Sequence, residues 1–263
     1  MSKPSRKKNI PAETLTSSEK RQQPVAGKVQ FALDWLKRHS SKATRDGMAR
    51  YAIPSESAFG VSMSNIQLLA KSLGRSHELA EALWNTHWYE ARLLAAYVDE
   101  PARVTAAQMD RWCRDFDNWA VCDTICFALF DRTPHAWRKV EQWSRSRDEF
   151  VKRAAFALLW GLTVHDKIAN DASFVRGLLL VERAASDERH FVMKAVNMAL
   201  RAIGKRNSAL NTSALAVARR LAASPQAAAR WVGQDAVREL TSPKVIRRLA
   251  AKHGAGVDPS EQP

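Results

Sequence analysis

Segments of nine residues that resemble one another recur along this chain. Copies that begin at Trp88, Phe150 and Phe191 align without gaps, and a weaker copy begins at Trp119. Successive copies start 31, 31 and 41 residues apart, which is the length of two helices and two turns. Because one helical pair cannot bury its apolar face alone, this period predicts that neighbouring pairs stack into a solenoid.

The remaining sequence pattern favours helices as well. Almost every segment between the ends reads as helix, and no stretch shows the strict alternation of a half-buried strand. The sequence therefore predicts an all-α fold, a right-handed superhelical solenoid of HEAT-like helical-pair repeats with a concave basic groove. A compact helical domain without repeats is the alternative.

Capping residues indicate where several helices begin and end. Thr105 and Gln108 have the spacing of a capping box. A hydroxyl residue before a proline predicts three further helix starts, at Thr133-Pro134, Ser224-Pro225 and Ser242-Pro243. Gly74 and Gly204 stand where a left-handed residue would end a helix.

Composition divides the chain into three segments. Residues 1–26 combine Lys and Arg with Pro, Ser and Gln and show no apolar period, which predicts a disordered basic tail. Residues 27–253 hold the expected repeat domain, and residues 254–263 are expected to form a flexible end.

Charge limits the class of partner. The 263 residues carry a formal net charge of +14, and folded proteins this basic usually bind nucleic acid or an anionic membrane surface, although charge can also serve solubility alone. The longest nearly apolar stretch, residues 154–164, is too short to cross a bilayer. The N-terminus lacks the apolar segment of a secretory signal. We therefore expect a cytoplasmic protein that contacts no membrane.

The repeat alignment places positive charge at equivalent positions. The fourth residue of two aligned copies is Arg153 and Lys194. Equivalent positions of a solenoid face the same side, so these cations are expected to follow a phosphate backbone. An apolar or mixed face would instead indicate a scaffold that binds proteins.

The motifs give no support to metal or cofactor chemistry. Cys113, Cys122 and Cys126 lack the paired spacing of a structural zinc site, and the seven histidines are scattered. Neither a Gly-rich phosphate loop nor a nucleophile elbow occurs. We expect buried free thiols, no metal and no cofactor.

One carboxylate is notable because nothing local explains it. Asp117 can cap the helix that follows it, whereas Asp123 lies in mid-helix among apolar residues. Trp119 and Asp123 are four residues apart, so they share one helix face. From the residues alone, a core tryptophan and a solvated aspartate are the simpler interpretation.

Taken together, several short motifs resemble the DNA alkylation repair family of HEAT-like-repeat DNA glycosylases, of the AlkD type. The resemblance covers about residues 30–240, and its specificity comes from the shared order and spacing of motifs that are individually weak. In chain order these motifs occupy residues 48–51, 59–61, 119–123, 152–155 and 194–197, the last running into Leu200-Arg201.

The resemblance implies roles for particular residues. Asp123 matches the catalytic carboxylate of the family, Trp119 matches the aromatic beside it, and Arg153 matches an inner-face arginine that would hold a phosphate. Tyr51 falls where the family has a DNA-contacting tyrosine. A second groove tryptophan of the family would fall at Met198, which has no aromatic face.

Two further cations are candidates for DNA binding. Lys194 lies on the inner face implied by the repeats, and the Lys205-Arg206 pair follows Gly204 in an expected turn. The pair is expected either to hold backbone phosphate or to form an ordinary solvated helix end.

The function that the resemblance implies is that of a monofunctional DNA glycosylase. Such an enzyme hydrolyses the N-glycosidic bond of cationic alkylated purines, such as 3-methyladenine and 7-methylguanine, in duplex DNA for base excision repair. We expect it to act as a monomer. A DNA-binding repeat protein without catalytic activity is the alternative, because Met198 departs from the family pattern.

Overall fold

A computed structural model describes residues 24–254, with side chains up to residue 251. These residues form fourteen α-helices and two short 3-10 helices, which are joined by loops. No strand occurs among the described residues, so the all-α prediction is confirmed. Helix α2 begins at Val25, because the fixed φ and missing N–H of Pro24 suit the position before a first turn. The basic tail predicted over 1–26 otherwise lies outside the described residues, as does the predicted flexible end beyond residue 254.

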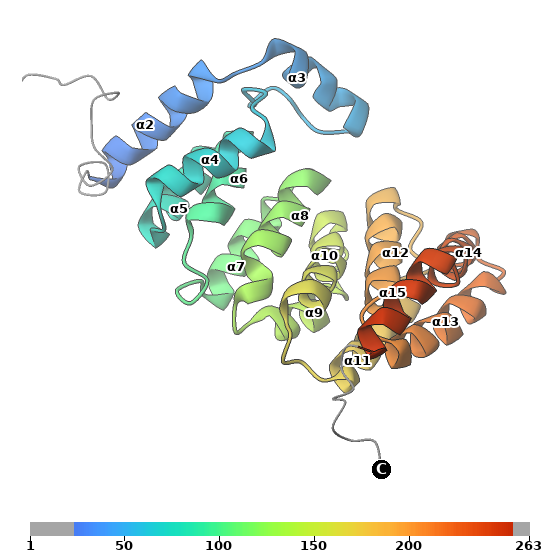
Figure 1. Ribbon diagram of the computed structural model, residues 1–263. Coiled ribbons are helices and arrows are strands. Elements are labelled where there is room, and N and C mark those ends of the chain that lie inside the picture. Colours follow the sequence, from blue (N-terminus) through green and yellow to red (C-terminus); the bar gives the residue numbers. More distant parts are fainter. Residues whose placement is uncertain (1–23, 255–263) are drawn as a thin grey trace, which may run out of the picture. The chain divides into compact units, whose positions relative to one another are not determined.

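The chain folds as two compact units, one ending at Glu100 and the other beginning at Pro101. In the first unit, α4 and α5 pack against α6, and α2 packs against α5 (Figure 1). Its helices are α2 (Val25–Arg38), α3 (Lys42–Gly47), η2 (Met48–Tyr51), α4 (Met63–Leu73), α5 (His77–Trp84) and α6 (Tyr89–Val98).

A buried carboxylate fastens the loop before α4 to α6 in the first unit. Both oxygens of Glu90 accept hydrogen bonds from backbone, from Phe59 N at 2.9 Å, Gly60 N at 2.6 Å and Val61 N at 3.1 Å. Gly60 has a φ of +80°, and a Cβ there would lie 2.3 Å from the carbonyl oxygen of Ser41. The motif at residues 59–61 is therefore a fixed turn that only glycine allows.

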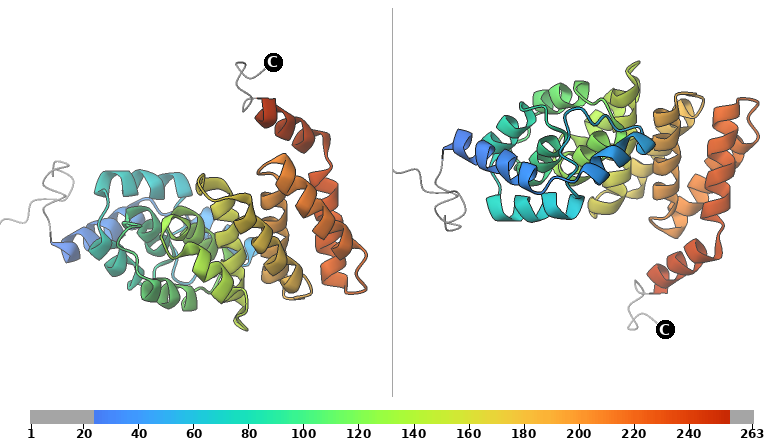
Figure 2. Two further views of the ribbon diagram at one scale, coloured as in Figure 1. Left: turned by 90° about the horizontal axis from the view of Figure 1, so that it is seen from below. Right: turned by 90° about the horizontal axis from the view of Figure 1, so that it is seen from above.

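The second unit is built from two layers of helices. The even-numbered helices α8, α10, α12 and α14 pack one after another, and the odd-numbered helices pack against them. The helices are α7 (Ala106–Arg114), α8 (Trp119–Ala128), η3 (Phe130–Arg132), α9 (Ala136–Trp143), α10 (Glu149–His165), α11 (Asp171–Ala184), α12 (His190–Gly204), α13 (Ser208–Ala222), α14 (Ala227–Leu240) and α15 (Pro243–Gly254). The two turned views show α13 and α14 side by side (Figure 2).

The repeated segments coincide with helix starts. Trp88 is the residue before α6, Trp119 is the first residue of α8, and Phe150 and Phe191 are the second residues of α10 and α12. The copies thus mark the starts of every second helix, from α6 to α12. The repeating unit is a helical pair, as predicted.

Two predicted helix starts are confirmed. The Thr105 hydroxyl accepts the backbone N–H of Gln108 at 3.1 Å, and the Ser242 hydroxyl accepts that of Val245 at 3.4 Å. Gly74 ends α4 as predicted and has a φ of +74°, but its ψ of −172° is extended and not that of the predicted left-handed cap.

Two other predicted helix starts are wrong. Helix α9 starts at Ala136 because the Thr133 hydroxyl donates to the Phe130 carbonyl at the end of η3 instead of capping. Helix α14 starts at Ala227, since the Ser224 hydroxyl accepts Gln226 N within the preceding turn. Helix α12 ends at Gly204 as predicted, but this residue lacks the positive φ of a left-handed cap. Its small size serves packing instead, because a Cβ there would lie 2.7 Å from the Leu240 methyls.

Within residues 24–254, no helix combines the length and the apolar character needed to cross a membrane. The three cysteines are free and buried.

Candidate active site

Helix α8 carries the first two residues of the candidate site. Asn118, rather than Asp117, caps this helix, and its side-chain oxygen accepts the backbone N–H of Val121 at 3.0 Å. The helix therefore starts at Trp119, and Asp123 lies one turn further on the same face. Both side chains are half-buried, so Asp123 is neither fully solvated nor enclosed.

Asp123 forms a two-pronged ion pair with Arg153 of α10. Arg153 Nε donates to Asp123 Oδ1 at 2.9 Å, and Arg153 Nη2 donates to Asp123 Oδ2 at 2.7 Å. The third guanidinium nitrogen, Nη1, donates to the carbonyl oxygen of Phe191 on α12 at 2.8 Å. The Asp123 side chain is 15% exposed and that of Arg153 is 6% exposed. One guanidinium thus joins three consecutive even-numbered helices.

Burial and charge act in opposite directions on this carboxylate. Desolvation raises the pKa of Asp123 above its ordinary value, and the neighbouring Arg153 cation works against that rise. Arg153 keeps its charge, because arginine stays protonated in proteins. The anionic form of Asp123 therefore depends on the guanidinium beside it.

Aromatic rings lie at the N-terminal ends of the same helices. The rings of Phe150 and Phe191 are 5.3 Å apart between centroids, and the guanidinium carbon of Arg153 is 5.9 Å from the centroid of Phe191. Both rings are half-buried. In the sequence, these two residues stand out only as the starts of repeated segments, not as candidates for the site. The signal that could have found them is their alignment with Trp119.

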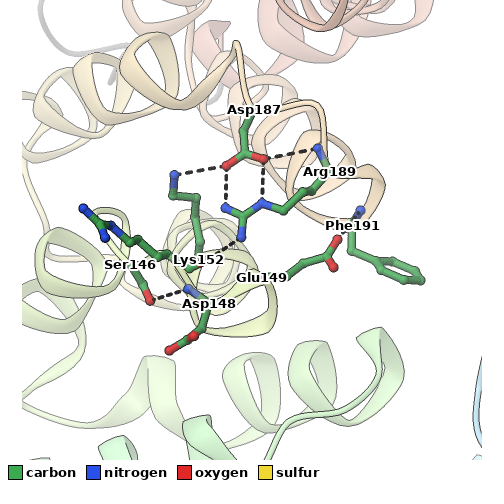
Figure 3. Close-up of polar contacts among 8 residues, drawn as sticks. Ser146, Asp148, Glu149, Lys152, Asp187, Arg189 and Phe191 are labelled. Carbon is green, nitrogen blue, oxygen red and sulfur yellow. Dashed lines mark hydrogen bonds and ion pairs between the residues drawn. The ribbon is translucent and has the colours of Figure 1, made fainter.

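An ion-pair network holds the start of α12 against the start of α10 (Figure 3). Asp187 accepts from Lys152 at 3.1 Å and from both Nε and Nη2 of Arg189, at 2.9 and 2.6 Å. Arg189 also donates to the carbonyl oxygen of Arg147, and Phe191 N donates to Glu149. The hydrogen bonds from Arg189 lower the pKa of Asp187 to about 2 despite its partial burial. This network positions the Phe191 carbonyl that Arg153 uses.

The other predicted DNA-binding residues on α12 and after it occupy different environments. Lys194 is exposed, with its ammonium 4.4 Å from the ring centroid of Trp231 on α14, and Met198 is half-buried one turn further along α12. Lys205 donates to Glu239 at 2.6 Å. Arg206 donates to the carbonyl oxygens of Thr163 and Ala169 and covers the ring of Phe174.

Tyr51 belongs to the first unit. It is the last residue of η2, and its side chain is 65% exposed. Among residues 24–254, no three His, Cys, Asp or Glu side chains are grouped so that they could hold a metal ion.

Stacked helical pairs of this kind define a HEAT-like helical-repeat protein. A solved structure of the same fold comes from "a new family of proteins related to the HEAT-like repeat DNA glycosylases with affinity for branched DNA structures"; it is 19% identical, with 80% of this chain and 94% of that chain aligned and a TM-score of 0.68. The model of the DNA alkylation repair enzyme family matches residues 32–240, and the chain belongs to this family. No curated protein matches the sequence.

Proposed function

We propose that this protein is a monofunctional DNA glycosylase that hydrolyses the N-glycosidic bond of cationic alkylated purines in duplex DNA. 3-Methyladenine and 7-methylguanine are the expected substrates, and base excision repair is the process. The observation that carries the proposal is the half-buried Asp123 carboxylate, held by Arg153 in a fixed orientation. Family membership supports DNA as the partner.

The chemistry needs little more than a well-placed negative charge. A purine alkylated on a ring nitrogen is already cationic and leaves without a general acid. As the bond breaks, positive charge develops on the deoxyribose in an oxocarbenium-like transition state. A fixed carboxylate stabilises this charge more in the transition state than in the ground state, and so raises the rate. Asp123 would also orient the attacking water.

Arg153 acts in this proposal as a positioning residue. The family resemblance implies that its guanidinium holds a DNA phosphate. In the folded protein, Arg153 makes its two-pronged contact with Asp123, and its third nitrogen is bonded to Phe191 O. A similar grip on phosphate would require this ion pair to break. We infer that Arg153 orients the carboxylate and keeps it ionised.

The aromatic residues supply a surface for the sugar and the damaged base. Trp119 shares a helix face with Asp123, so its electron-rich ring can lie against the developing cation, an attraction of about 0.5–2 kcal/mol. Met198 offers no such surface, but Phe150 and Phe191 place two rings near Arg153. We propose that Phe191 takes the role that the family gives to its second tryptophan.

The decisive experiment measures release of 7-methylguanine from methylated duplex DNA under single-turnover conditions. Asp123→Asn keeps the shape of the side chain and removes its charge, so release should fall about a hundredfold or more. DNA affinity should change little. The matched control is Asp110→Asn, because Asp110 forms a comparable ion pair with the buried Lys139 at 2.6 Å in the same unit. Equal loss in both variants, or no loss in Asp123→Asn, would refute the catalytic role.

A second candidate function is binding of branched DNA without catalysis. Two observations favour it: the structurally similar protein is described as having affinity for branched DNA structures, and both oxygens of Asp123 already accept hydrogen bonds from Arg153. Comparing the affinity for a four-way junction with that for a linear duplex tests it. A strong preference for the junction, together with no base release by the wild type, would favour this function over the glycosylase.

A further inference from the structure

Helix α14 gives two kinds of partner to the cations on α12 and just after it. Trp231, Asp235 and Glu239 are spaced four residues apart, so they form one face of α14. Arg201 forms ion pairs with Asp235, at 3.7 Å, and with Glu239, and Lys205 donates to Glu239 at 2.6 Å. Lys194 meets the ring of Trp231 instead of a carboxylate. The two cations near the end of α12 are neutralised, whereas Lys194 keeps its positive charge.

Lys194 is held without being neutralised. Its ammonium lies 4.4 Å from the centroid of the Trp231 ring, within the range of a cation–π interaction. No carboxylate among the described residues lies within ion-pair distance of it, and the side chain is exposed. The ring fixes the ammonium group while leaving its N–H donors available to a ligand. Such a donor suits a singly charged phosphate oxygen.

Contacts through α12 link this pair to the candidate active site. Arg153 donates to Phe191 O, and Phe191 and Lys194 lie three residues apart on the same turn of α12. The pair is therefore one helix away from Arg153, about 8–10 Å for packed helices. Trp231 also occupies the place in α14 that Lys194 occupies in α12 and Arg153 in α10, since each is the fifth residue of its helix.

We propose that Lys194 and Trp231 form a binding site for the sugar–phosphate backbone of a DNA strand, next to the site of the damaged nucleotide. Lys194 binds a phosphate oxygen, and the exposed part of the Trp231 ring lies against the adjoining deoxyribose. This inference deepens the proposed function and rests on DNA being the ligand. No sequence motif singles out Trp231, which lies 33 residues beyond the non-aromatic Met198.

Binding of a labelled undamaged duplex at several salt concentrations tests the phosphate contact. Lys194→Gln should weaken binding several-fold and reduce the slope of log affinity against log salt by about 0.9, the loss of one phosphate contact. The matched control is Arg176→Gln on α11, which removes an exposed cation that donates to the hydroxyl of Ser173 on the same helix. An unchanged slope in Lys194→Gln, or an equal change in both variants, would overturn the proposal.

Two substitutions at Trp231 test the role of the ring. Trp231→Phe keeps an aromatic face and should bind nearly as the wild type does, whereas Trp231→Leu should weaken binding about two- to fivefold. The effects of Trp231→Leu and Lys194→Gln should be less than additive when combined, because the ring acts partly through the lysine. If Trp231→Leu lowers the thermal unfolding temperature but leaves affinity unchanged, the pair serves only to hold α12 against α14.

Base release distinguishes failure of this inference from failure of the glycosylase proposal. With the protein saturating, the control variant Arg176→Gln should release 7-methylguanine at the wild-type rate, because it leaves Asp123, Lys194 and Trp231 intact. If the wild type releases no base but Lys194→Gln still shows the reduced slope, the backbone site stands and the glycosylase proposal fails. If the wild type releases base and the slope is unaltered, the reverse holds.

Discussion

At the scale of single residues, Arg153 controls the orientation and the ionisation of Asp123. Its guanidinium donates to both carboxylate oxygens and to one backbone carbonyl. Burial raises the pKa of Asp123, and Arg153 is the charge that opposes this rise. The protonation state of the candidate catalytic group is therefore set by a neighbour that lies 30 residues away in the sequence.

This arrangement predicts the pH dependence of base release. Release should fall at acid pH as Asp123 becomes protonated. Because the pKa of Asp123 is raised, this fall should occur at a higher pH than for an ordinary aspartate. Arg153→Gln removes the opposing cation, so the pKa should rise further and the acid limb should move to higher pH. A pH–rate profile of release measures this shift.

Arg153→Lys provides the comparison. It keeps a positive charge but loses the planar fork that contacts both oxygens. The acid limb should move less than in Arg153→Gln, while the maximal rate should still fall because the carboxylate is held less firmly. Superimposable profiles for the wild type and Arg153→Gln would show that the guanidinium does not control the ionisation of Asp123.

The members of the site could be proposed from the sequence, but their pairing could not. Trp119, Asp123 and Arg153 were proposed from family resemblance, and the repeat placed Arg153 and Lys194 at equivalent positions. The Asp123–Arg153 ion pair depends on how α8 and α10 are each rotated about their own axes. The spacing of the repeats does not fix that rotation to better than a fraction of a helical turn. The contribution of Phe191 could not be predicted either, because Arg153 binds its backbone oxygen and any residue at that position would supply the same atom.

At the scale of helices, α13 and α14 approach closely at Gly233. A Cβ at this position would lie 2.2 Å from Ala222 N and 2.6 Å from Ala218 O, both backbone atoms that cannot move aside cheaply. Gly233→Ala should therefore destabilise the protein by about 1–3 kcal/mol through overpacking, although alanine is the better helix former. Chemical denaturation measures the change in the free energy of unfolding.

Gly47 is the matched control for this prediction. It ends α3 with an ordinary right-handed conformation, and a Cβ there would meet nothing within 4 Å. Gly47→Ala should stabilise by about 0.4–1 kcal/mol, mainly by restricting the unfolded chain. Changes of the same sign at both glycines would contradict the packing explanation.

The network around Asp187 predicts a dependence of stability on acid. Its folded-state pKa is about 2, below the ordinary 3.8. The ionised form is therefore favoured by folding, so this stabilisation is present above pH 3.8 and is lost as the pH falls through about 2. Asp187→Asn should cost on the order of 1 kcal/mol at neutral pH, after discounting for solvent screening.

Measuring the free energy of unfolding at pH 7 and near pH 2 tests this sign. The difference between the wild type and Asp187→Asn should shrink at the lower pH, because Asp187 is then about half protonated in the folded protein and almost fully protonated in the unfolded chain. A difference that persists near pH 2 would show that the charge of Asp187 is not what stabilises the start of α12.

Helix existence was predictable, whereas several helix ends were not. Thr105 and Ser242 cap as their local patterns indicate. Thr133 and Ser224 have the same local pattern, yet their hydroxyls bond within the preceding turn. The choice between these bonds depends on how the preceding turn is placed by tertiary packing. Gly204 ends α12 as predicted, but without the left-handed conformation, and its small size accommodates Leu240 from α14.

At the scale of the whole molecule, the net charge of +14 predicts strongly salt-dependent DNA binding. The logarithm of affinity for an undamaged duplex should fall linearly with the logarithm of salt concentration, as bound phosphates release counterions. Fluorescence anisotropy across a salt series measures this slope. Affinity that stays constant over the series would contradict an electrostatic DNA interface.

The anchor of Arg153 on α12 is an oxygen of the main chain, and every amino acid at position 191 would present that same atom. The ring of Phe191 can therefore be exchanged without releasing the clamp on the carboxylate. In the proposed function, the aromatic surface and the clamped carboxylate can in this way be varied independently, so substitutions at position 191 test the ring without disturbing the ion pair.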